Sequence, residues 1–246
     1  MELKKTSIAL WLLSSDITNP TLDDILAFAK TKKFSEAEDF IFKELKKQKL
    51  DGVYQKIELP LIPVVSKIKE RGIKIDKNYL AKLAKKYHKE LSRLEKKIYT
   101  HAGEEFNINS PKQLGEVLFE KMGLTVKNQK RTGTGQKSTR ESELEKMRDT
   151  HPVIDDLLNY RELQKLLSTY IDNIPQMVHE DGRLHAEFLQ AGTTTGRMAS
   201  QNPNLQNIPI RTELGRKIRN AFVASEGFSL VALDYSQIEL RMAAVL

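Results

Sequence analysis

One stretch of the sequence, residues 76 to 98, constrains the fold more than any other. Asp76 is a good N-cap residue, and the apolar side chains that follow it recur at alternating spacings of three and four residues. This spacing places them on one face of a helix: Leu80, Leu83, Ala84, Tyr87, Leu91, Leu94 and Ile98. The stretch therefore predicts a long amphipathic helix with one buried stripe.

Composition excludes several classes of protein. The 246 residues are 39% hydrophobic and 30% charged, which is typical of neither a membrane-spanning nor a disordered chain, and we expect no membrane association. The absence of cysteine excludes disulfides, thiol nucleophiles and cysteine-bound metal sites, and it fits a cytoplasmic protein. The net charge of +7 favours a polyanionic partner without proving one.

Proline and glycine divide the chain into three parts. Residues 1 to 56 have the pattern of short helices, and a second helix is predicted from Leu61 to Arg71. Residues 73 to 174 form a helical, basic module. Within it, Ser110 and Gln113 predict a capping box for a helix over 111 to 122, and Ser138 to Glu141 is predicted to cap another helix. A longer helix is predicted to begin at Pro152, to run through Ile174 and to be stopped by Pro175. After it, alternation predicts a strand over 183 to 190, and the apolar run Phe228 to Leu233 predicts a buried strand followed by a helix from Ser236.

Two basic features have both a structural and a functional interpretation. The face of the long helix opposite its apolar stripe carries Lys82, Lys85, Lys86, Lys89, Arg93, Lys96 and Lys97. The segment 127 to 140 has five cations, no acid, two glycines and several hydroxyls, which suits a flexible loop that follows phosphates. Each feature is equally well explained as a solvated surface.

An acid at the end of a buried strand, directly before a helix, is a recurrent position for a metal-binding carboxylate. Asp234 is predicted to occupy that position, and Glu239 follows it by five residues. From the pattern alone, Asp234 is equally well explained as the N-cap of the following helix.

Several blocks carry a resemblance to the family A DNA polymerases, the bacterial DNA polymerase I group. Asp234-Tyr-Ser-Gln-Ile-Glu-Leu-Arg241 resembles the palm motif of that family at all eight positions. Similar matches, in the same order, are Thr195-Gly-Arg-Met-Ala-Ser200, Asn204-Leu-Gln-Asn-Ile-Pro-Ile-Arg211, Ile57-Glu-Leu-Pro-Leu, Arg71-Gly-Ile-Lys-Ile-Asp, Asn109-Ser-Pro-Lys-Gln-Leu and the Thr132-Gly-Thr-Gly loop.

The resemblance implies an α+β, mainly helical fold in three parts. Residues 1–56 would be the end of a degenerate 3′-5′ exonuclease-like domain, residues 57–175 the DNA-gripping thumb with its basic loop 127–140, and residues 176–246 the start of an antiparallel-sheet palm. The expected function is template-directed DNA synthesis from dNTPs on primer-template DNA, by a monomer. The lysine-rich helix and the loop would then follow the phosphates of the product duplex.

The resemblance also implies roles for single residues. Asp234 would be the catalytic, metal-binding carboxylate, with the carbonyl of Tyr235 as a further ligand to two Mg²⁺ ions. Arg197 would contact the terminal primer pair in the minor groove, and Glu239 would occupy the space that a ribose 2′-hydroxyl needs. The nucleotide side would include Gln237, Glu239 and Arg211, and the DNA side Arg197, Asn204, Gln206, Asn207, Lys127, Lys130, Arg131, Thr132, Lys137 and Arg140. His185 is interpreted as structural.

The sequence departs from the family pattern at both ends. Around Phe34 to Glu38 the acids of a 3′-5′ nuclease are missing, so we expect no proofreading. At the other end the triphosphate-binding helix and the second metal carboxylate are absent, so we expect a fragment that is inactive alone. A non-catalytic module that binds primer-template DNA without sequence preference is the main alternative. A single-subunit RNA polymerase is disfavoured by Glu239, and a nuclease by its missing acids.

Overall fold

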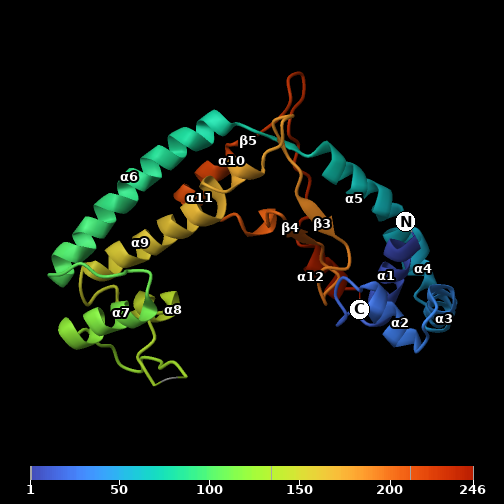
Figure 1. Ribbon diagram of the computed structural model, residues 1–246, viewed down its shortest axis with the longest axis horizontal. Helices are drawn as coiled ribbons and strands as arrows, with labels where there is room; N and C mark the ends of the chain where they lie inside the picture. The colour runs from blue at the N-terminus through green and yellow to red at the C-terminus, as the bar shows by residue number, and fades with distance from the viewer. Residues whose placement is uncertain (1, 134, 211, 246) are drawn as a thin grey trace.

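The computed structural model describes residues 2–133, 135–210 and 212–245. These residues form an open arch, with a long helical arm on one side, a group of N-terminal helices on the other, and short strands between them (Figure 1). The expected fold class is confirmed in outline, because the chain is mainly helical with two small antiparallel sheets. No helix of the described residues is both long and apolar enough to cross a membrane.

The N-terminal residues form short helices, as the sequence predicts, and the structure shows that these helices pack around a core of their own. In α3 the buried residues Ala37, Ile41 and Leu45 are spaced by four, so one face of the helix meets Ile8 and Leu10 of α1. The elements of this part are α1 (Glu2–Leu13), α2 (Leu22–Ala29), α3 (Phe34–Lys47), α4 (Asp51–Val53), the π-helical turn η1 (Tyr54–Glu58) and α5 (Leu59–Arg71).

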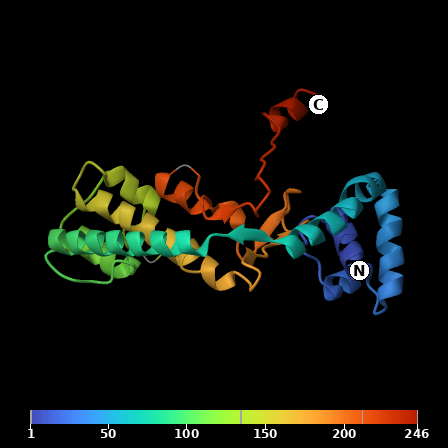
Figure 2. The same cartoon turned by 90° about the horizontal axis from the view of Figure 1, so that it is seen from above.

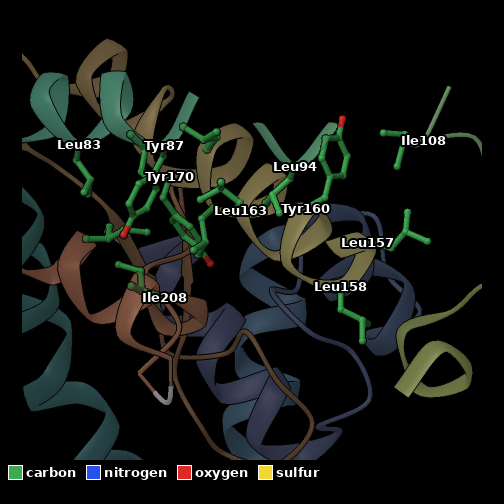
Figure 3. Packing of buried hydrophobic residues seen from close by; sticks show 14 of the residues in the cluster. Leu83, Tyr87, Leu94, Ile108, Leu157, Leu158, Tyr160, Leu163, Tyr170 and Ile208 are labelled. Carbon is green, nitrogen blue, oxygen red and sulfur yellow. The ribbon is translucent and has the colours of Figure 1, made fainter. Parts of the chain in front are cut away.

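The arm is built on the long helix that the sequence predicts. Helix α6 (Lys77–Ala102) begins where the Asp76 carboxylate accepts a hydrogen bond from the backbone N–H of Tyr79 at 2.8 Å. Its apolar stripe packs along α9 (Val153–Leu166), and Leu83, Tyr87 and Leu94 lie in the core that both helices share (Figure 3). A π-helical turn, η4 (Leu167–Ile171), and α10 (Ile174–Met177) continue from α9, and Pro175 lies in the first turn of α10.

At the tip of the arm the predicted helices form with different caps. Helix α7 (Pro111–Gly115) continues into η2 (Glu116–Lys121), and the Ser110 hydroxyl accepts from the Gln113 N–H as predicted. The return bond of a capping box is absent between these residues, because the Gln113 side chain accepts from the Asn107 N–H instead. Helix α8 (Glu141–Leu144), with η3 (Glu145–Met147), has Arg140 as its N-cap residue, so the prediction that Ser138 caps it is wrong.

The strands are shorter than the sequence predicts. Strand β1 (Ile73–Ile75) pairs antiparallel with both β2 (Arg183–Leu184) and β5 (Phe222–Val223), while β3 (Glu187–Leu189) pairs antiparallel with β4 (Ala199–Gln201). The single strand predicted over 183 to 190 is therefore two strands in different sheets. The turn η5 (Leu205–Asn207) and α11 (Glu213–Arg219) follow β4.

The prediction of a buried strand over Phe228 to Leu233 is wrong. These residues form no strand, and Val231 and Leu233 are 78% and 93% exposed. The last helix, α12 (Ile238–Ala243), begins two residues later than predicted, after Gln237, whose backbone is left-handed with φ 53°. Figure 2 shows this part of the chain standing away from the body of the molecule. An apolar run is not enough to make a strand without a neighbouring strand to pair with.

Candidate nucleic-acid interface

The described residues of the basic segment 127 to 140 form a hairpin closed by a single β-bridge, where the sequence predicts a flexible loop. Arg131 and Lys137 form an antiparallel bridge, and the backbone N–H of Ser138 donates to the Lys130 carbonyl at 2.8 Å. At the turn, the N–H of Thr132 donates to the Gln136 carbonyl at 2.7 Å, and the Arg131 guanidinium donates to the Gly135 carbonyl. Lys127, Lys130, Arg131, Thr132 and Arg140 are exposed and Lys137 is half-buried over the Phe119 ring, so the hairpin presents most of its cations to solvent.

A buried carboxylate fixes this hairpin to α8. Glu143 is 2% exposed, and its carboxylate accepts from the backbone N–H of Lys130 at 3.0 Å and from the Lys146 ammonium at 2.7 Å. The bond from Lys146, followed by that from Lys130, lowers the pKa of Glu143 below its usual value. The ionised form of Glu143 therefore holds the base of the hairpin.

Helix α9 contributes two cations that the sequence analysis missed. The Arg161 guanidinium donates to the Thr139 carbonyl at the end of the hairpin, and burial lowers the pKa of Arg161. Arg161 and Lys165, one turn further, line a cavity of about 400 Å³ that Pro209 and Thr212 also border. Their spacing of four residues, which places both cations on one face of the helix, was the available signal.

The segment around η5 is held by its own side chains. Asn204 caps η5 by accepting from the N–H of Gln206 at 3.0 Å, and the Gln206 amide donates to the Met198 carbonyl at 2.8 Å. Asn204, Gln206 and Asn207 are exposed. They belong to the segment between β4 and α11, and the chain between those two labels runs between the arm and the N-terminal helices (Figure 1).

Arg197 lies in the loop between β3 and β4 and is exposed. Its carbonyl accepts from the Thr193 hydroxyl at 2.7 Å, which closes the loop. Arg211, the other arginine predicted for the site, lies outside the described residues.

The C-terminal motif is fully accessible. Asp234, Tyr235, Gln237 and Glu239 are all exposed, and Glu239 lies in the first turn of α12. Gln237 is the N-cap residue of that helix and makes no side-chain cap, so the interpretation of Asp234 as an N-cap is wrong. No group of three histidine or acidic side chains among the described residues is arranged to hold a metal ion.

The lysine-rich face of α6 is divided between two directions. Figure 1 shows α6 along the outer edge of the arch, with α9 on its inner side. The apolar stripe faces α9, so Lys82 and Lys85, on the opposite side of the helix, point away from α9. The other basic residues of this face line a groove of about 980 Å³ beside α9, which Leu214 of α11 also borders: Lys86, Lys89, Arg93, Lys96 and Lys97. The hairpin cations are not among the residues that line this groove.

His185 makes structural contacts, in agreement with its predicted role. Its Nδ1 lies 2.7 Å from the Lys69 carbonyl and its Nε2 lies 3.0 Å from the Asp181 carboxylate. The imidazole thereby ties the end of α5 to the β2 region.

Comparison with known proteins gives consistent matches. The sequence profile of DNA polymerase family A matches residues 77–246. The thermostable DNA polymerase I of Thermus aquaticus is 48% identical over 198 residues, which are 80% of this chain and 24% of that protein. DNA polymerase I of Deinococcus radiodurans is 50% identical over 193 residues, which are 78% of this chain and 20% of that protein. The chain thus spans about a quarter of the length of these curated relatives or less.

A solved structure extends the match to the N-terminal helices. It is described as the POL domain of Pol1 from M. smegmatis in complex with DNA primer-template and dNTP. The TM-score is 0.88 at 32% sequence identity, and the alignment covers 97% of this chain and 44% of that one.

Proposed function

The chain belongs to DNA polymerase family A, and from this premise we propose that it is the DNA-gripping part and the first palm segment of a longer enzyme. That enzyme would extend a primer 3′-hydroxyl with deoxynucleotides, in replication or repair, as a cytoplasmic monomer. Residues 57–175 would be the thumb and residues 176–246 the start of the palm. Residues 1–56 would be an exonuclease-like remnant without proofreading activity.

One observation carries the proposal. The chain aligns over 97% of its length with a polymerase domain that is described in complex with primer-template DNA. It presents a basic hairpin, the Arg161 guanidinium bonded to the end of that hairpin, and the exposed polar residues of η5. Lys127, Lys130 and Arg140 would contact phosphates, which are the same for every sequence. Arg131, Thr132 and Lys137 would add to this contact from the turn of the hairpin.

The palm residues would act on the primer terminus and the nucleotide. Arg197 would reach the minor groove of the terminal pair, where the purine N3 and pyrimidine O2 acceptors occupy similar places in every correct pair. Asn204, Gln206 and Asn207 would line the path of the duplex beside it. Gln237, Glu239 and Arg211 would lie at the nucleotide, where Glu239 would exclude a 2′-hydroxyl.

The family is metal-dependent, and we assign Mg²⁺ to this enzyme. Asp234 and the Tyr235 carbonyl would be oxygen ligands of the kind that Mg²⁺ prefers. The described residues do not by themselves fit a pair of ions, because no three histidine or acidic side chains among them are grouped to hold a metal ion. The remaining ligands would come from the rest of the longer enzyme.

The lack of any three-ligand metal group among the described residues also supports a second function for the chain alone. It would then bind primer-template DNA without catalysing extension. This function differs from the first in one observable respect, since the chain alone would bind DNA but leave the primer length unchanged.

The test is a titration of labelled primer-template duplexes of unrelated sequence with the chain. We expect similar affinities for all sequences, and a fall of orders of magnitude between about 50 and 200 mM salt if several phosphates are contacted. A strong preference for one sequence, or an affinity that salt does not change, would contradict the proposal. A second assay separates the two functions: the chain alone should not extend a primer, and joining it to the remaining polymerase segment of a relative should restore extension.

A further inference from the structure

The N-terminal helices are bonded to the loop that carries Arg197. The Trp11 indole N–H of α1 donates to the Thr193 carbonyl at 2.8 Å, across 182 positions of sequence. Beside it, the N–H of Asn19 donates to the Ala191 carbonyl at 2.8 Å. The Gln190 amide donates to the carbonyl and carboxylate of Glu58, both at 3.0 Å. The N-terminal part and the turn before α5 thus hold three of the residues from 190 to 193, namely Gln190, Ala191 and Thr193.

We propose that Trp11 is a positioning residue for Arg197. The nuclease-like N-terminal helices would then serve polymerisation by holding the loop between β3 and β4, which carries Arg197. The inference rests on the proposed function, in which Arg197 contacts the terminal primer pair. It assigns a role to residues 1–56 that does not depend on nuclease chemistry.

Trp11 acts on Arg197 through one intervening residue. Thr193 accepts the indole hydrogen bond with its carbonyl and donates its hydroxyl to the Arg197 carbonyl at 2.7 Å. The path from α1 to the Arg197 backbone is therefore two hydrogen bonds long. The other two contacts reach only Ala191, through Asn19, and Gln190, through Glu58, and neither of these residues is hydrogen-bonded to Arg197. Trp11 is therefore the N-terminal residue whose hydrogen bond lies nearest to Arg197 on this path.

The loop has little room to adjust if this contact is lost. A side chain on Gly192 would place its Cβ only 2.6 Å from the Ala199 Cβ and 3.0 Å from the Leu189 Cβ, so the backbone here is closely packed between β3 and β4. Trp11 is itself 4% exposed, which fixes the direction of its N–H. A buried donor with a single fixed orientation is suited to setting the position of a loop.

The sequence provides a direct probe, because Trp11 is the single tryptophan of the chain. The full chain is titrated with a primer-template duplex that has a recessed 3′ end, while DNA binding is followed separately by the anisotropy of a label on the DNA. We expect the Trp11 emission to change as the duplex binds. In Arg197→Ala the DNA should still bind through the hairpin, but the change in emission should disappear.

Four variants separate positioning from packing. Trp11→Phe keeps an aromatic ring and loses the N–H, while Thr193→Val loses the hydroxyl that Thr193→Ser keeps. The readout is the affinity for a recessed, matched primer terminus relative to a mismatched one. We expect Trp11→Phe and Thr193→Val to lower this ratio by up to about tenfold, the size of one hydrogen bond, and Thr193→Ser to retain it. Ile41→Val, in the core of the N-terminal helices, lowers stability without touching the loop and should leave the ratio unchanged.

The outcomes are distinguishable. If the wild-type chain binds the duplex but Trp11→Phe and Thr193→Val keep the wild-type ratio of matched to mismatched affinity, the positioning role is overturned. Trp11 would then contribute only packing to the N-terminal helices. A fall in the ratio for Ile41→Val equal to that for Trp11→Phe would overturn it equally, since the effect would then be loss of stability. A wild-type chain that fails to bind any duplex would overturn the proposed function itself, and with it this role.

Discussion

The arm and the C-terminal segment both contain periodic apolar residues in the sequence, but these residues are buried in the arm and exposed in the C-terminal segment. Leu80, Leu157 and Ile98 in the arm are completely buried, whereas Leu233 and Val231 in the segment 228–245 are largely exposed. The arm helices come as a pair that covers both stripes within the described chain. In the C-terminal run, Phe228 to Val231 border other apolar side chains, among them Ile68 and Val223, and these residues still stay exposed. Apolar patterning therefore predicts burial only where the same stretch of chain supplies the facing surface.

This difference separates two kinds of residue. Stability is concentrated in the arm and in the N-terminal core, where buried side chains touch many neighbours. The residues assigned to nucleotide chemistry lie in the exposed segment and contribute little to the fold. A substitution should thus change either stability or activity, according to the region in which it lies.

The largest effect is expected for Asp234→Asn in the chain completed with the rest of a polymerase. Loss of a metal-binding carboxylate should reduce the rate of primer extension more than about a thousandfold, or roughly 4 kcal/mol of transition-state stabilisation. Thermal unfolding of the variant should be unchanged, because Asp234 is exposed. Glu226→Gln, another exposed acid in the same part of the chain, is the control and should extend primers normally. If Asp234→Asn extended primers at the wild-type rate, Asp234 would not be a metal-binding carboxylate of this reaction.

A pair of leucine substitutions tests the comparison itself. Leu157→Ala empties a fully buried site in the arm and should lower the free energy of unfolding by about 2 to 5 kcal/mol. Leu233→Ala, which removes the same atoms from an exposed site, should change it by less than about 0.5 kcal/mol. Chemical denaturation of the two variants gives the measurement. Equal losses would mean that the C-terminal run is packed in solution.

Glu239→Ala addresses sugar selection in the completed enzyme. If the side chain fills the space beneath the nucleotide C2′, the ratio of kcat/KM for ribo- over deoxyribonucleotide should rise by roughly tenfold or more, about 1.4 kcal/mol. An acid in the first turn of α12 also interacts favourably with the helix dipole. If that were its only role, the variant would be slightly less stable and the ratio would stay as it is.

The smallest effect is expected from pH at the hairpin. The pKa of Glu143 is lowered in the folded chain from the usual value of 4.5, so its contribution to stability is fully present above about 4.5 and is lost as the pH falls through the lower, folded-state value. The protection of the Lys130 N–H, the factor by which it exchanges more slowly than in an unfolded chain at the same pH, should fall over that range, because this N–H donates to the Glu143 carboxylate. Glu143→Gln should exchange faster at neutral pH and show less of this pH dependence.

Features set by local sequence were predicted best. The long helix after Asp76, the helix ending at Gly72 and the short N-terminal helices depend on caps and periodic apolar residues, and all are present. The strands were predicted poorly because their extent depends on partners far away in the chain. Strand β1 lies between β2 and β5, and more than a hundred residues separate it from each of them in sequence.

The candidate site was predicted in part for a related reason. The hairpin cations and the palm motif were identified from composition and resemblance, but Arg161 was overlooked because its role depends on a carbonyl at Thr139 brought to it by the fold. The assignment of the lysine-rich face of α6 to the duplex stays a prediction, because charge alone does not indicate which of its side chains meet a partner. The packing of α6 beside α9 decides that Lys86 and Lys89 line a groove.

We propose that primer-template DNA lies along the hairpin and not along Lys82, Lys85 and Lys89 of α6. Two charge-matched variants test it: Lys127→Gln, Lys130→Gln and Arg140→Gln together on the hairpin, and Lys82→Gln, Lys85→Gln and Lys89→Gln together on α6. All six side chains are exposed, so both variants should fold and both lose three positive charges. The measurement is the slope of log affinity for a primer-template duplex against log salt concentration. The hairpin variant should bind more weakly and its slope should flatten by up to about 2.7, or 0.9 for each lost phosphate contact, while the α6 variant should keep nearly the wild-type slope. A flatter slope in the α6 variant, with a wild-type slope in the hairpin variant, would contradict the claim.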